Sequence, residues 1–159
     1  MTKKIVFIAD FFVEQVSGGG ELVNEEVVRR LRGYKYSVQK KRSQDVTCKF
    51  IQENKDCFFI VGNFIALSED CKESLKNKAY VIYEHDHKYL TTRDPSHFHA
   101  YFAPNEFIVN KDFYSHARAI FCQSAIHAEV VSKNLLLENI VNLGCSLWNS
   151  RTLDYIEEL

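Results

Sequence analysis

Three consecutive glycines followed by a glutamate, Gly18-Gly19-Gly20-Glu21, have the clearest potential for chemistry in this chain. They follow an apolar run and open an amphipathic pattern. Glycine lets a ligand approach bare backbone, and the start of a helix offers unpaired N–H groups with a partial positive charge. The run therefore predicts a loop that holds a phosphate or a sugar.

The glycine run has two other interpretations. Glycines can serve only to pack a helix against a sheet. The run is not the dinucleotide fingerprint, because its spacing is not G-x-G-x-x-G. The next expected strand also ends in Lys40-Lys41-Arg42 rather than in an acid that would hold a ribose. Simple NAD binding is disfavoured, and a reductase that holds a 2′-phosphate on these basic residues stays open as an alternative.

A second polar segment, Glu84-His85-Asp86-His87, directly follows an apolar run. Imidazole and carboxylate together can supply an acid/base pair, with the carboxylate orienting the ring. We therefore predict that these four residues contact a ligand or take part in catalysis. The competing interpretation is a polar loop whose histidines are simply solvated.

Nearby residues extend the same polar region. A metal site would recruit His97 and His99, but adjacent residues of an extended segment point to opposite faces, so we expect no bound metal. Arg93 can clamp a phosphate with two parallel hydrogen bonds, or it can pair with Asp94. The residue types leave both of these open.

The elements that must position these residues alternate regularly along the chain. Strands are expected at 4–9, 36–41, 57–61, 79–84, 119–123 and 139–143. Helices are expected at 20–32, 45–54, 68–77, 106–115, 125–135 and 150–158. This rhythm predicts an α/β fold: one Rossmann-like, doubly wound domain over residues 1–159, with about six parallel strands and helices on both faces. Right-handed crossovers favour the strand order 3-2-1-4-5-6.

In such sheets, ligands bind beyond the carboxyl ends of the strands. This places Asn63 and Ser124, which follow two apolar strands, beside the glycine run and the Glu-His-Asp-His segment. The segment 91–105 has no clear period and is expected to be a substrate loop. Within it, Tyr101 and Phe102 can stack on a sugar or lie at a membrane interface.

Composition sets the broad class. The chain has 159 residues, a net charge of −1 and 46% hydrophobic residues, which fits one soluble domain without a general attraction to nucleic acid. Its five cysteines form no CxxC pair, which favours free thiols in a reducing compartment. We expect a cytoplasmic protein.

The strand, the Gly18-Gly19-Gly20-Glu21 turn and the segment after the fourth strand together resemble the N-terminal Rossmann-like domain of GT-B glycosyltransferases, nearest to the retaining family 4 enzymes. Gln123-Ser124 at a helix start and Leu143-Gly144 after the last strand add to the likeness. The resemblance covers most of the chain, although no single motif in it is highly specific.

The resemblance implies a transferase that moves a sugar from a nucleotide-sugar donor to a carbohydrate acceptor, in glycan biosynthesis. Such enzymes need no bound metal or other cofactor. The glycine loop would approach the donor phosphates and the reacting sugar. His85 or His87 would contact the transferred sugar, Glu84 and Asp86 would orient that histidine or bind acceptor hydroxyls, and Asn63 and Ser124 would be secondary contacts.

The family's second domain, which carries the nucleotide pocket, has no counterpart in these 159 residues. We therefore expect one half of a GT-B cleft. Three explanations stay open: a piece of a longer enzyme, one chain of a split enzyme that a second copy or a partner chain completes, or a small free-standing protein. The alternative function is a non-catalytic module that binds carbohydrate or nucleotide and works with a partner. Membrane contact has only weak support, from Tyr101, Phe102 and a basic stretch between residues 29 and 42.

Overall fold

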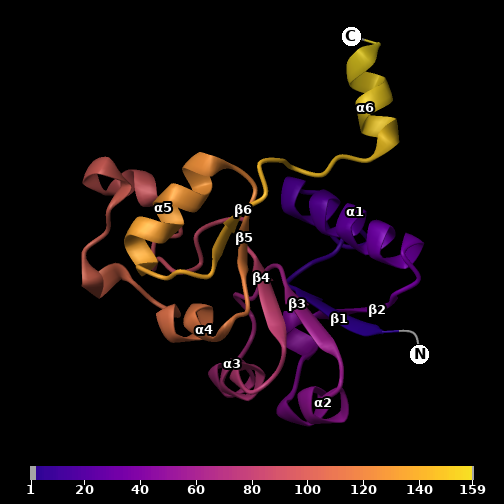
Figure 1. Cartoon of the computed structure of the whole chain (residues 1–159), viewed down its shortest axis with the longest axis horizontal. Coiled ribbons are helices and arrows are strands. Elements are labelled where there is room, and N and C mark those ends of the chain that lie inside the picture. Colours follow the sequence, from indigo (N-terminus) through magenta and orange to yellow (C-terminus); the bar gives the residue numbers. More distant parts are fainter. Residues whose placement is uncertain (1–2, 159) are drawn as a thin grey trace.

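All six expected strands form and pair in one parallel sheet, in a computed structural model that describes residues 3–158 (Figure 1). Their bounds are β1 (Lys4–Ala9), β2 (Ser37–Arg42), β3 (Phe58–Val61), β4 (Tyr80–Tyr83), β5 (Ile120–Cys122) and β6 (Ile140–Asn142). Nearly continuous apolar strands such as β3 and β4 fit a sheet that is covered on both faces. The α/β prediction is confirmed.

Six α-helices alternate with these strands. They are α1 (Gly19–Gly33), α2 (Cys48–Glu53), α3 (Glu69–Lys76), α4 (Lys111–His116), α5 (Ala125–Leu135) and α6 (Ser150–Glu157). Short polar side chains mark where α2, α3 and α5 begin: the hydroxyls of Thr47, Ser68 and Ser124 each accept a hydrogen bond from a first-turn N–H. Such a cap stabilises a helix by about 1 kcal/mol.

The strand order is β2-β1-β3-β4-β5-β6, so the predicted order 3-2-1-4-5-6 is wrong. The physical reason lies in β2 and β3. The sequence of β2, Ser-Val-Gln-Lys-Lys-Arg, buries only Val38 and suits the edge of a sheet, where charged side chains protect the open strand. The all-apolar β3 takes the central place beside β1 instead. The strand order therefore reverses between β1 and β3.

The two faces of the sheet are covered unequally. Alternate residues of β1 enter different cores: Val6 and Ile8 join the large core under α2 to α5, and Ile5 and Phe7 join a smaller core under α1. Figure 1 shows α1 on one side of the sheet and α2 and α3 on the other. Leu147, from the segment between β6 and α6, also packs on the α1 face.

The segment between β4 and α4 is more structured than the sequence indicates. It contains three 3₁₀ turns, Pro95–His97, His99–Tyr101 and Asn105–Phe107, and α4 begins only at Lys111, so the helix predicted at 106–115 is too long. Asn134 of α5 anchors this segment: its Oδ1 accepts from Ala103 N–H at 2.8 Å, and its Nδ2 donates to Tyr101 O at 2.8 Å.

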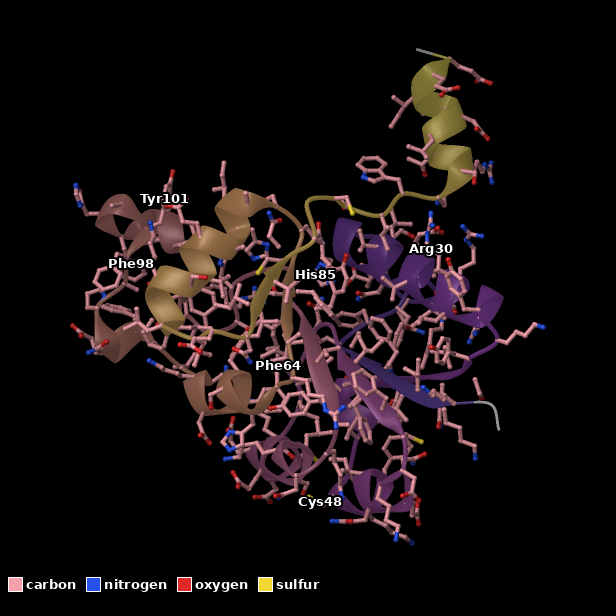
Figure 2. All side chains as sticks on the ribbon, viewed as in Figure 1. Arg30, Cys48, Phe64, His85, Phe98 and Tyr101 are labelled. Carbon is pink, nitrogen blue, oxygen red and sulfur yellow. The ribbon has the colours of Figure 1, made fainter. Side chains whose placement is uncertain are left out.

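The chain holds Tyr101 outward through two successive left-handed residues. Ala100 and Tyr101 have φ angles of 51° and 59°, a region that L-residues rarely adopt. Tyr101 and Phe102 are about half exposed, whereas Phe113 is buried in the core and Phe107 packs against that core. Figure 2 shows Phe98 and Tyr101 at the far end of the molecule from α6.

All five cysteines are free thiols, as the sequence predicts. Cys57, Cys71 and Cys122 are buried, and Cys145 is exposed. The Sγ atoms of Cys48 and Cys71 lie 4.0 Å apart, where α2 packs beside α3. Within residues 3–158, no helix combines the length and the apolar character needed to cross a lipid bilayer.

Candidate functional site

A cavity of about 490 Å³ opens at the carboxyl edge of the sheet, close to the point where the strand order reverses. Its volume is in the range of small-molecule sites. Fourteen residues from five regions line it: Gly19, Gly20, Glu21, Leu22, Val23, Asn63, His85, Asp86, Gln123, Ser146, Leu147, Trp148, Asn149 and Thr152. The glycine turn and the Glu-His-Asp-His segment therefore meet at one hollow.

The first turn of α1 forms one wall of this cavity. Gly18 is the N-cap and supplies no side-chain cap, so the N–H groups of the first turn have no intrahelical partner. A Cβ at Gly19 would meet no atom within 4 Å, because this position faces open space. The carboxylate of Glu21, the third helical residue, lies close to Gly18.

His85 is held from both sides. Gln123 Nε2 lies 3.0 Å from His85 Nδ1, and His85 Nε2 lies 2.9 Å from Asn24 Oδ1. Because the amide nitrogen of Gln123 only donates, Nδ1 accepts and Nε2 carries the proton that is donated to Asn24. Both ring nitrogens are therefore engaged, and the ring carbon Cγ lies 3.6 Å from where a Cβ of Gly20 would be. His85 thus joins α1, the end of β4 and the end of β5.

Burial lowers the pKa of His85 from its ordinary value of 6.5 to about 4, and repulsion from Lys88 adds to this effect. The imidazole is therefore neutral at pH 7. A neutral ring suits its place between two amides, since protonated Nδ1 could no longer accept from Gln123.

Asn24 completes this arrangement from beneath the cavity. The residue is fully buried on α1, and its Nδ2 has no hydrogen-bond partner among the described residues. A Cβ at Gly62 would lie 3.0 Å from that Nδ2 and 3.2 Å from the ring of Phe7. Glycine at position 62 therefore makes room for Asn24, which in turn fixes His85.

Glu84 lies away from the cavity. Its side chain is fully buried and accepts hydrogen bonds from the Tyr114 hydroxyl and, at 3.1 Å, from Asp86 N–H. Burial and the nearby Glu84 raise the pKa of Tyr114 well above its usual range, which keeps the phenol protonated as a donor. The contacts of Glu84 therefore join β4 to α4.

Asp86 lines the cavity and is partly neutralised. One carboxylate oxygen pairs with Lys88 Nζ, which is almost fully buried, and the other lies 3.3 Å from Arg93 Nη1. Of the two alternatives for Arg93, pairing with a carboxylate is what the structure shows, although the partner is Asp86 rather than Asp94. Neither Lys88 nor Arg93 lines the cavity.

His87 turns away from His85. It has a left-handed φ of 54°, its Nδ1 lies 2.9 Å from the Tyr89 hydroxyl, and its ring centroid is 4.8 Å from that of His127. Burial lowers the pKa of His87 and of His127. Of the two histidines that the sequence left as alternatives, only His85 lines the cavity.

Of the two predicted secondary contacts, one lines the cavity and the other does not. Asn63 lines the cavity and Ser124 does not, since its hydroxyl caps α5 by accepting from His127 N–H at 3.2 Å. No residue of the expected substrate loop, 91–105, lines this cavity.

Sequence reasoning missed two groups of lining residues. Gln123 was noticed only for its place after β5, and its amide contact with His85 gives no signal in the sequence. The second group comes from the segment after β6 and the first turn of α6: Leu147, Trp148, Asn149 and Thr152. The sequence predicts a helix at 150–158 but does not show that this region lies against the start of α1. The one available signal was Trp148, the single tryptophan of the chain.

Two alternatives for the chemistry lose support. Within residues 3–158, no three His, Cys, Asp or Glu side chains gather as metal ligands would. Two of the three basic residues at the end of β2 have acidic partners: Lys40 pairs with Glu14 and Glu25, and Arg42 pairs with Asp45. The third, Lys41, lies over the ring of Phe50. The two ion pairs leave less charge there for a 2′-phosphate.

No protein-family model matches this chain, and a comparison with curated proteins finds no match either. The fold is thus a six-stranded, all-parallel, Rossmann-like α/β sheet without a family assignment.

Proposed function

We propose that this chain is a glycosyltransferase domain that holds the acceptor sugar in the cavity between α1, β4 and the segment after β6. The single observation that carries the proposal is that Gly19, Gly20 and His85 line one cavity at the carboxyl edge of the sheet. The resemblance to the N-terminal domain of GT-B enzymes rests on these same residues. In the transfer, an acceptor oxygen would bond to the anomeric carbon of the donor while the nucleoside diphosphate leaves.

The polar lining supports a sugar as the ligand. Asn63 and Gln123 carry amides, and Asp86 and Glu21 carry carboxylates, which together donate to and accept from hydroxyl groups. Asn63 Oδ1 is buried and has no hydrogen-bond partner among the described residues. The bare backbone at Gly19 lets a sugar or its donor approach α1 closely.

In this proposal, His85 acts as a positioning residue. Both of its nitrogens are engaged, so it holds Gln123 and the start of α1 in place around the ligand. Asp86 is the carboxylate that faces the acceptor hydroxyls, and its pairing with Lys88 and Arg93 fixes its orientation. Donor, nucleotide and acceptor act as substrates, and no further cofactor is needed.

A second candidate function, a non-catalytic sugar-binding module, is favoured by one specific observation. The cavity offers no free imidazole, and Asp86, one of its two carboxylates, is engaged by two cations. Such a module would bind the same ligands without transferring them, alone or with a partner chain.

The test is to incubate the protein with a panel of nucleotide sugars and glycoside acceptors, and to measure released nucleoside diphosphate and bound sugar. Gly19→Val adds a side chain to the open cavity, and transfer and binding should fall at least tenfold. Gly33→Val is the matched control, because Gly33 lies at the other end of α1 and also faces open space. Binding without release would favour the module. Wild-type protein that neither binds nor transfers any of these sugars would refute both functions.

A further inference from the structure

We infer that Trp148 forms an aromatic platform for the ligand, and that the cavity selects a neutral sugar ring whose C–H face packs on the indole. The inference rests on the proposed function and deepens it, because it names the ligand class and a residue that determines specificity. It is argued from the two kinds of lining, the charge of the cavity and the position of the segment after β6.

The cavity is amphipathic. Amide, imidazole and carboxylate groups reach it from the strand ends, at Asn63, His85, Asp86 and Gln123. Apolar side chains reach it from α1 and from the segment after β6, at Leu22, Leu147 and Trp148. A pyranose ring has the matching character, with hydroxyl groups at its edge and C–H groups on its faces. Aromatic side chains provide a large, flat apolar surface for such a face.

Trp148 is available for this contact. Its side chain is 50% exposed although it lines the cavity, and Leu22 beside the cavity is 47% exposed. Because burial of apolar surface is favourable, a ligand that covers the exposed half of the indole is stabilised by that contact. A sugar ring between the indole and the polar wall would therefore cover the exposed indole and bond to the polar wall at the same time.

The charge of the cavity favours a neutral ligand over a phosphate. Glu21 and Asp86 are the only charged side chains in its lining. The Glu21 carboxylate also folds over Gly18, at the helix start where an anion would otherwise be stabilised. A phosphate would meet these carboxylates, whereas sugar hydroxyl groups can donate to them.

The segment that carries Trp148 is anchored at its two ends. Leu143 N–H donates to Cys122 O at 2.8 Å, and Gly144 follows with a left-handed φ of 68° that favours glycine. At the other end, the Asn149 side chain caps α6. Figure 1 shows this segment passing the start of α1 before it reaches α6, which leaves Trp148 beside the glycine turn.

The experiment follows amide and indole signals of ¹⁵N-labelled protein by NMR. Probes are the methyl glycosides of glucose, galactose, mannose and N-acetylglucosamine, and, separately, uridine and guanosine diphosphates. Because the chain has one tryptophan, the indole N–H signal belongs to Trp148 alone. We expect a glycoside to shift the indole signal and the amides of Gly19 and Gly20 with one dissociation constant. Trp148→Ala should weaken binding roughly tenfold, and Trp148→Phe should retain most of it.

Tyr155→Ala is the matched control, since Tyr155 is an aromatic residue of α6 that is 61% exposed and does not line the cavity. It should bind as the wild type does. If the glycine amides shift but the indole does not, and Trp148→Ala binds normally, the platform is wrong and the proposed function stands. If no glycoside shifts either the indole signal or the glycine amide signals, the proposed function fails and the platform fails with it. If only the nucleoside diphosphates shift the indole, the inference of a neutral sugar is overturned.

Discussion

Acid should weaken the fold through the buried His85. The imidazole sits neutral between Asn24 and Gln123, and protonation would place a second donor against the Gln123 amide. The perturbation is a fall in pH from 7 to 4, applied to the wild type and to His85→Gln. Gln keeps a polar side chain at this position but does not titrate.

The magnitude follows from the pKa. In the folded chain the pKa of His85 is about 4, against an ordinary value of 6.5. The folded state therefore binds fewer protons than the unfolded state between these values, so stability falls as the pH falls. The loss is about 3 kcal/mol at pH 4 and levels off below that pH, and well above pH 6.5 this group contributes almost no pH dependence.

The assay is urea denaturation followed by circular dichroism at a series of pH values. The free energy of unfolding of the wild type minus that of His85→Gln should decrease by about 3 kcal/mol between pH 7 and pH 4. Burial also lowers the pKa values of His87 and His127. Both proteins contain these two histidines, so most of their contribution to the pH dependence cancels in the difference. His116→Gln, at a half-exposed site on α4, is the control for the loss of a histidine away from the cavity.

A difference that does not change with pH would refute the reasoning. So would an NMR titration in which the His85 ring protonates near pH 6.5. Either result would mean that the imidazole is not enclosed between the two amides, and the positioning role would lose its physical basis.

Three further substitutions test single contacts. Asp10→Ala removes a carboxylate that accepts from two N–H groups after β3 at 3.0 Å, and should lower the free energy of unfolding by roughly 2–4 kcal/mol in urea denaturation. Tyr114→Phe deprives the buried Glu84 of its hydroxyl donor and should cost roughly 1–3 kcal/mol in the same assay. Asn134→Leu removes the anchors of the segment 95–107, and limited proteolysis should cut that segment much faster than in the wild type, whereas an unchanged rate would contradict the anchoring role.

The elements were predictable because their signals are local. The strands β1, β3 and β4 read as apolar runs, and the sequence predicts α5 at 125–135, which are the residues it occupies. Strand order is not local, but β2 carried an unused clue: three successive basic residues do not suit the centre of a sheet. The polar composition of β2, considered together with crossover handedness, predicts a place at the edge of the sheet.

The site was predictable only to the level of segments. The rule on strand ends brought Gly19 and His85 to one edge, and they line one cavity. It could not separate His85 from His87, because the left-handed φ of His87 and the contact of its ring with His127 give no signal in the sequence. Nor could it find Trp148, whose place depends on how the chain leaves β6.

The most direct test of the central claim is a crystal structure of the protein with the glycoside that binds most tightly. The account predicts electron density for the sugar between the Gly19–Gly20 turn and the side chains of Asp86 and Trp148, with His85 still bonded to Asn24 and Gln123. A sugar bound elsewhere, for example against Tyr101, with no sugar in this cavity, would contradict it.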